Sequence, residues 1–91
     1  MQIEKDTIVF KSSPEFYFKE RDGHKCNTIR HFYDCHELES FDRFRQGFDF
    51  NKPNKKIKIW EATGKEGYFV RTITDISFFN GYYIISWRHD K

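Results

Sequence analysis

Lys25, Thr28 and Arg30 are the residues whose types and spacing could do chemistry together. They follow Gly23, which frees the backbone for a tight turn. In a strand, side chains two residues apart share a face, so Thr28 and Arg30 point the same way and Lys25 approaches from the preceding loop. A lysine and an arginine placed like this can hold a phosphate, with the guanidinium as the bidentate partner. An ordinary exposed turn and strand is the alternative interpretation.

A second candidate site is the basic segment around Trp60. The segment contains Lys52, Lys55, Lys56 and Lys58, and strand alternation places Trp60 on the same face as Lys56 and Lys58. Lysines beside an aromatic ring are typical of single-strand nucleic-acid binding, in which bases stack on the ring. Lysines also protect the edge strands of sheets from aggregation, so a lysine-protected edge strand is the alternative.

Histidines and cysteines gather in one stretch, namely His24, Cys26, His31, Cys35 and His36. A zinc site needs tetrahedral convergence of its ligands, and its cysteines are usually close in sequence. Cys26 and Cys35 are nine positions apart, so we expect neither a metal site nor any other cofactor. Two cysteines are also too few for a disulfide scaffold, and free thiols are the simplest interpretation.

The first half of the chain predicts two short helices between strands. Residues 7–10 are apolar and mostly β-branched and predict a strand, and a second strand is expected over 28–32. Ser13 and Pro14 predict the start of a helix over 14–21, which ends at Asp22 and Gly23. Apolar residues at helical spacing predict an amphipathic helix over 36–46 that ends at Gly47.

The second half predicts an antiparallel meander. Residues 55–63 alternate, with Ile57, Ile59 and Glu61 on one face. A turn over 64–67 leads to a strand over 68–77, whose apolar phase slips and indicates a bulge. Asn80 and Gly81 predict a tight hairpin into a central strand over 82–87. The expected fold class is therefore α+β: a small curved, mostly antiparallel β-sheet or barrel with two short helices.

Length and composition set further bounds. The chain has 91 residues, so we expect a single domain over 1–91, and its 20% aromatic content can build a core in so short a chain. A mean hydropathy of −0.85 excludes a membrane span, and residues 1–6 lack the order of a signal peptide, so we expect a monomeric, cytoplasmic protein. The net charge of +2 predicts that any nucleic-acid binding is weak.

The segment Gly23-His24-Lys25-Cys26-Asn27-Thr28-Ile29-Arg30 resembles the G-x-K-x-x-T-x-R signature of ASCH domains, a branch of the PUA-like superfamily. The setting is also similar, because a predicted short helix precedes the motif and a predicted strand follows it. Further matches cover about two-thirds of the chain: Ile57-Lys58-Ile59, Gly67 through Arg71, Ile73-Thr74-Asp75-Ile76 and Gly81-Tyr82-Tyr83-Ile84-Ile85-Ser86.

This resemblance implies a small curved β-barrel flanked by helices, with a cleft lined by Lys25, Thr28 and Arg30. PUA-like domains commonly bind RNA, and some ASCH proteins hydrolyse the acyl group of a modified cytidine. In those hydrolases, residues matching Lys25 and Thr28 work with a carboxylate from a later segment. The helical insertion expected to carry it has no counterpart here, because residues 77–80 pass directly into the predicted hairpin. Glu61 and Asp75 are the nearest carboxylate candidates.

Three functions are open at this point. The first is a small nucleic-acid-binding module of the PUA-like type, with RNA favoured over DNA. The second is a small amidohydrolase that acts on an acylated nucleoside through Lys25 and Thr28. The third is a phage or mobile-element protein that binds a protein partner. For the first function, the expected nucleic-acid contacts are Lys25, Arg30, Lys56, Lys58, Trp60 and Arg71.

Overall fold

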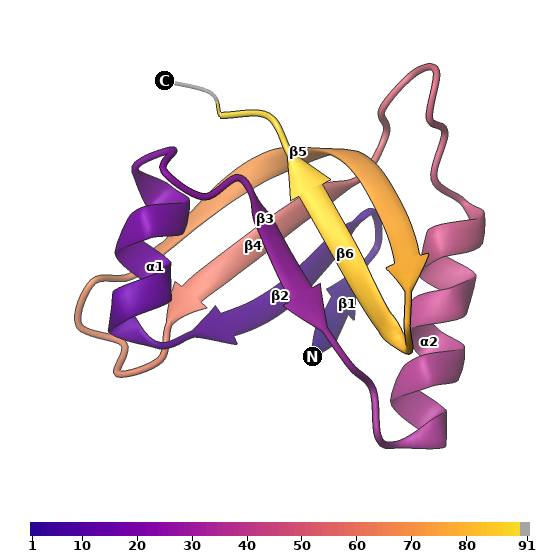
Figure 1. The fold of residues 1–91 in the computed structure, drawn as a ribbon, viewed down its shortest axis with the longest axis horizontal. Coiled ribbons are helices and arrows are strands. Elements are labelled where there is room, and N and C mark those ends of the chain that lie inside the picture. The colour runs from indigo at the N-terminus through magenta and orange to yellow at the C-terminus, as the bar shows by residue number, and fades with distance from the viewer. Residues whose placement is uncertain (90–91) are drawn as a thin grey trace.

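A computed structural model describes residues 1–89, with six strands and two helices (Figure 1). In chain order these are β1 (Gln2–Glu4), β2 (Thr7–Ser12), α1 (Pro14–Arg21), β3 (Asn27–Arg30), α2 (Cys35–Gln46), β4 (Lys56–Glu61), β5 (Tyr68–Phe79) and β6 (Tyr82–Trp87). The predicted α+β class is confirmed. The last two residues of the predicted domain, Asp90 and Lys91, lie outside the described residues.

The strands form one open sheet in the order β1-β2-β4-β5-β6-β3, so β1 and β3 are its edges. Every neighbouring pair is antiparallel except β2 and β4, which run parallel. The parallel pair places Ile8 and Phe10 of β2 beside Ile57 and Ile59 of β4, and all four side chains are buried. Burial of this shared apolar face joins two segments that are far apart in the sequence.

The predicted meander of β4, β5 and β6 is confirmed. Ile57, Ile59 and Glu61 are the buried residues of β4, as the alternation indicates. The hairpin turns at Asn80 and Gly81, whose φ values of 56° and 85° are both in the left-handed region that this turn type requires. The register of β5 against β6 shifts between Ile73 and Asp75, which is the predicted bulge.

Strand β5 bends the sheet over itself. Its first half pairs with β4 and its second half pairs with β6, and Figure 1 shows it arching from one layer to the other. Helix α1 and helix α2 lie at opposite ends of the folded sheet. Helix α1 contributes Tyr17 to the core, and α2 contributes Phe41 and Phe44. Within residues 1–89, neither helix combines the length and the apolar character needed to cross a membrane.

Two local features differ from the expectations. Strand β1 was not predicted; it pairs with β2 through a turn in which Lys5 takes a φ of 57°. Strand β3 ends at Arg30 rather than at Phe32, because the His31 ring faces the hairpin between β5 and β6, where its Nδ1 donates a hydrogen bond to Gly81 O at 2.7 Å. Phe32 then turns inward and packs against Phe41, with 4.8 Å between the ring centroids.

Candidate functional site

A cavity of about 340 Å³ lies where α1, β2 and β3 meet. It brings together all three residues of the predicted chemical site, Lys25, Thr28 and Arg30. The complete lining is Lys11, Ser12, Ser13, Phe16, Glu20, Lys25, Thr28, Ile29 and Arg30. Three of these side chains are cationic and one is a carboxylate, so the cavity has an excess of positive charge.

Strand β3 aims two of these side chains inward. Thr28 pairs in register with the buried Ile85 of β6, and Thr28 itself is only 4% exposed. Arg30, two residues on, shares this inner face, whereas Ile29 points outward and is 56% exposed. The edge position of β3 matters here, because an edge strand leaves one side of its inner face open to a cavity.

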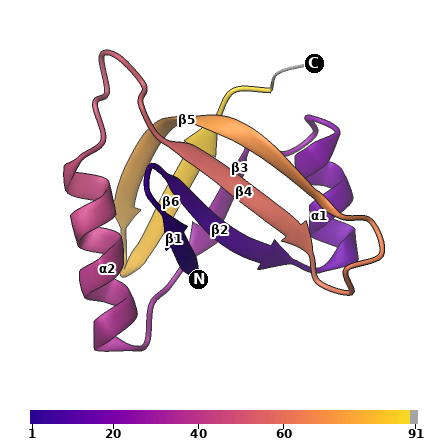
Figure 2. The ribbon, with the colours of Figure 1, turned by 180° about the vertical axis from the view of Figure 1, so that it is seen from behind.

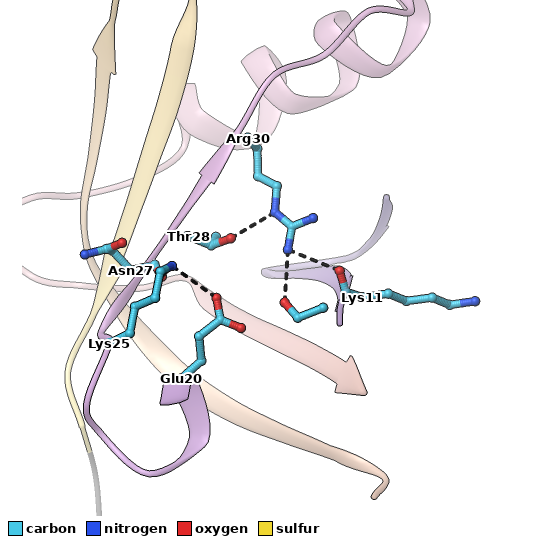
Figure 3. Close-up of polar contacts among 7 residues, drawn as sticks. Lys11, Glu20, Lys25, Asn27, Thr28 and Arg30 are labelled. Carbon is cyan, nitrogen blue, oxygen red and sulfur yellow. Dashed lines mark hydrogen bonds and ion pairs between the residues drawn. The ribbon is translucent and has the colours of Figure 1, made fainter. Parts of the chain in front are cut away.

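Arg30 connects the edge strand β3 to β2, the strand next to the opposite edge of the open sheet. Its Nε donates to Thr28 Oγ1 at 2.9 Å, and its Nη2 donates to Lys11 O at 3.2 Å and Ser12 Oγ at 3.3 Å (Figure 3). Its guanidinium also lies 4.4 Å from the centre of the Phe10 ring. These contacts join β3 to β2, although three strands separate them in the sheet order.

The positive charge of Arg30 is not neutralised by a direct partner. All its hydrogen-bond acceptors are neutral oxygens, and within residues 1–89 it forms no ion pair. Burial lowers the pKa of the Arg30 guanidinium, and the more distant charge of Glu20 partly opposes this. A partly buried cation with neutral partners favours an anionic ligand, because the ligand would offset the cost of desolvation.

Glu20 is the carboxylate of the cavity, and the sequence analysis missed it. It comes from α1 and is only 1% exposed. Lys25 Nζ lies 3.4 Å from Glu20 Oε2 and donates to Asn27 O at 2.5 Å, as Figure 3 shows. Glu20 Oε1 is buried and has no partner among the described residues. The available signal was helical spacing, because Glu20 lies three residues after the buried Tyr17 and therefore shares its face.

The first turn of α1 forms another wall of the cavity. Ser13 is the N-cap residue, as predicted, but its hydroxyl makes no capping hydrogen bond. Ser13 and Phe16 both line the cavity, and Phe16 is 49% exposed. The positive end of the helix dipole thus faces the same space as Arg30, and a flat ring lies at its rim.

The two carboxylates nominated from the sequence lie elsewhere. Glu61 points inward from β4 but accepts hydrogen bonds from the side chain and backbone of Thr63, and these lower the pKa of the Glu61 carboxyl. Asp75 accepts a hydrogen bond from Ser77 Oγ at 2.5 Å. Neither residue lines the cavity, so the carboxylate available to Lys25 and Thr28 is Glu20.

The remaining predicted nucleic-acid contacts fall into two groups. Lys56, Lys58 and Trp60 lie on the outer face of β4. Arg71 lies on the opposite face, in register with the buried Ile57, and its Nη2 donates to Arg21 O at the end of α1. The structure therefore brings Arg71 neither to the cavity nor to the outer face of β4.

The histidine and cysteine side chains do not form a metal site in the described residues. Among residues 1–89, no three of the His, Cys, Asp and Glu side chains converge as they would around a metal ion. Cys26 and Cys35 are free thiols in the described structure. Cys26 is half-buried and packs against the core, and its Sγ lies 3.6 Å from Gly23 O.

Fold and cavity together define a small α+β domain with a cationic cavity at the seam between β2 and β3. Comparison with protein families, with curated proteins and with solved structures found no match. The function proposed below therefore depends on the charges and contacts of the cavity and on the resemblance of its motif.

Proposed function

We propose that this chain is a small cytoplasmic RNA-binding module of the PUA-like type, in which the cavity at Lys25, Thr28 and Arg30 holds a phosphate group of the RNA. The observation that carries this proposal is the partly buried Arg30 guanidinium, whose hydrogen-bond acceptors are all neutral. A phosphate accepts charge-assisted hydrogen bonds from a guanidinium more strongly than a neutral oxygen does.

Other features of the cavity support a nucleotide as the ligand. A volume of about 340 Å³ is at the small end of the range for ligand sites and suits one nucleotide. The hydroxyls of Ser12, Ser13 and Thr28 can supplement the cations around a phosphate. The half-exposed ring of Phe16 offers a surface on which a base can stack. The resemblance of residues 23–30 to the ASCH signature favours RNA among the nucleic acids.

Replacement of Arg30 by methionine tests this proposal. The variant keeps an unbranched side chain over Phe10 but removes the charge. We expect a labelled single-stranded RNA octamer to bind about 10- to 100-fold more weakly, as the loss of a charge-assisted contact of about 1.5–3 kcal/mol predicts. Fluorescence anisotropy at fixed salt measures the affinity, and thermal unfolding verifies that the variant is folded.

Arg43→Met is the matched control, because it makes the same change in net charge on an exposed position of α2. Helix α2 lies at the other end of the molecule from α1, which borders the cavity (Figure 1). We expect Arg43→Met to bind nearly as wild type does. Equal affinities for the two variants would contradict a role for the cavity in phosphate binding.

Hydrolysis of an acylated nucleoside is the second candidate, because Lys25, Thr28 and Glu20 line the same cavity. In this function the Thr28 hydroxyl would attack the acyl carbonyl while a neutral Lys25 takes its proton. The proton would pass to the cytidine amino nitrogen as the C–N bond breaks, and water would then hydrolyse the acyl-threonine ester. The observed contacts favour binding instead: Thr28 Oγ1 accepts from Arg30, and no hydrogen bond joins it to Lys25 within residues 1–89. Lys25 is an ion-paired ammonium, which must lose a proton before it can act as a base.

A turnover assay with acylated cytidine distinguishes the two functions. If the chain is a hydrolase, Thr28→Ala will abolish turnover and leave ligand binding nearly intact. Lys25→Arg will also be inactive, because a guanidinium cannot serve as the base. If wild type releases no acyl group under conditions in which it binds the octamer, the hydrolase candidate is excluded.

A further inference from the structure

A basic and aromatic surface lies on the outer face of β2, β4 and β5, outside the cavity. We define this platform by Lys11, Lys56, Lys58, Trp60 and Tyr68. The strand register places Lys11, Trp60 and Tyr68 side by side in one row across the three strands. In Figure 2 the strands β1, β2 and β4 face the viewer, and no helix covers them.

Trp60 and Tyr68 form an aromatic pair at the surface. Their ring centroids are 4.8 Å apart with an interplanar angle of 51°, and Tyr68 is 50% exposed. Both belong to the outward-pointing set of their strands, so neither contributes to the core cluster. Exposed aromatic rings on a sheet are the stacking elements of single-strand binding surfaces.

The lysines of the platform are available to an anionic partner. Within residues 1–89, Lys11, Lys56 and Lys58 form no ion pair. Glu4 shares this face of the sheet, in the row that contains Lys56. Lys58 Nζ lies 4.4 Å from the Tyr68 ring centre and 5.5 Å from that of Trp60.

The position of β4 in the sheet excludes the alternative that these lysines protect an edge strand. Lysines on an edge strand prevent pairing with other chains. Strand β4, however, lies between β2 and β5 and has no free edge. Edge protection therefore cannot explain Lys56 and Lys58, and the interpretation of β4 as a lysine-protected edge strand is wrong.

We propose that the platform binds single-stranded RNA, with bases stacked on Trp60 and Tyr68 and phosphates held by the three lysines. The inference rests on the proposed RNA binding and extends it from one nucleotide to a strand. Lys11 lines both the cavity at Arg30 and a second pocket of about 410 Å³ at Trp60, so the two sites are adjacent. The ammonium of Lys58 leaves the rings when a base arrives, because an exposed cation–π contact is weaker than base stacking plus a phosphate contact.

The test uses labelled octauridylate, a duplex RNA of equal length and cytidine monophosphate as probes. We expect Trp60→Leu and Tyr68→Leu each to weaken octauridylate binding about 5- to 100-fold, which is the usual effect of removing one stacking ring. We expect the duplex to bind wild type at least about 10-fold more weakly than the single strand, because paired bases cannot stack on protein rings. Cytidine monophosphate, followed by NMR shifts at residues 25–30, reports on the cavity alone.

The outcomes separate this inference from the proposed function. If both ring variants bind octauridylate as wild type does while Arg30→Met binds it more weakly, RNA binding by the platform is excluded and phosphate binding in the cavity is supported. If the ring variants bind octauridylate more weakly and Arg30→Met binds it as wild type does, RNA binding by the platform is supported and phosphate binding in the cavity is excluded. Equal affinity for duplex and single strand, or no binding of octauridylate, overturns the platform. The cytidine monophosphate titration then tests independently whether the cavity binds a nucleotide. Tyr68→Leu, at a half-exposed position, keeps the test valid if Trp60→Leu does not fold.

Discussion

Lys25→Ala is expected to lower the free energy of unfolding by about 2–3 kcal/mol at neutral pH. Glu20 is 1% exposed and Lys25 Nζ is its ion-pair partner, at 3.4 Å from Oε2. The other carboxylate oxygen already has no partner among the described residues. Removal of the ammonium would therefore leave a buried, unpaired negative charge, which is a known cause of large losses of stability. Urea denaturation followed by circular dichroism measures the loss.

Two further variants separate this effect from a general loss of a lysine. Lys19→Ala breaks an exposed pair with Glu15 on the same helix, and we expect it to cost less than about 0.5 kcal/mol. Lys25→Ala combined with Glu20→Gln should recover most of the stability, because a neutral amide does not need a cation. A double variant no more stable than Lys25→Ala would mean that the two side chains are not coupled.

Phe41→Ala is expected to cost about 3–5 kcal/mol, the range for removing a fully buried aromatic side chain. Phe41 is 0% exposed and packs against Phe32, Phe44 and Tyr83, with 4.7 Å between its ring centre and that of Tyr83. A chain of this size has a total stability of about 5–14 kcal/mol, so the variant would be close to unfolding at physiological temperature.

Phe50→Ala is the control for Phe41→Ala, since it deletes the same atoms from a residue that is 67% exposed. We expect it to change the free energy of unfolding by less than about 0.5 kcal/mol. Thermal or urea unfolding of both variants in parallel measures the difference. Similar losses at the two positions would show that α2 is not anchored to the sheet through Phe41.

Local patterns in the sequence were sufficient to predict most of the elements. The alternation in β4, the Asn80-Gly81 hairpin and the amphipathic spacing of α2 all act over a few residues, and the structure contains each of them. Strand β1 was not predictable in this way, because it has three residues and Ile3 is its single apolar side chain. The parallel pairing of β2 with β4 was also missed, because it depends on burial between distant segments.

The candidate site likewise has features that follow from local sequence patterns and features that depend on packing between distant segments. Thr28 and Arg30 could be placed on one face because strand alternation is local, and both line the cavity. Glu20 was missed because a glutamate near the end of a helix is usually solvated, and its burial depends on how α1 packs against the sheet. Arg71 was assigned to a binding surface by residue type, whereas its register opposite Ile57 turns it inward.

The position of the cavity between β2 and β3 would couple the binding of a ligand there to the stability of the whole domain. The cavity takes its walls from strands that are separated by three others in the sheet, so it exists only while the full curvature of the sheet is present. A ligand in the cavity then binds the native state and not the unfolded chain. By mass action, a free ligand at about 100 times its dissociation constant would add roughly 2.7 kcal/mol to the free energy of unfolding. For a domain this small, a bound ligand would thus contribute a substantial part of the free energy of unfolding.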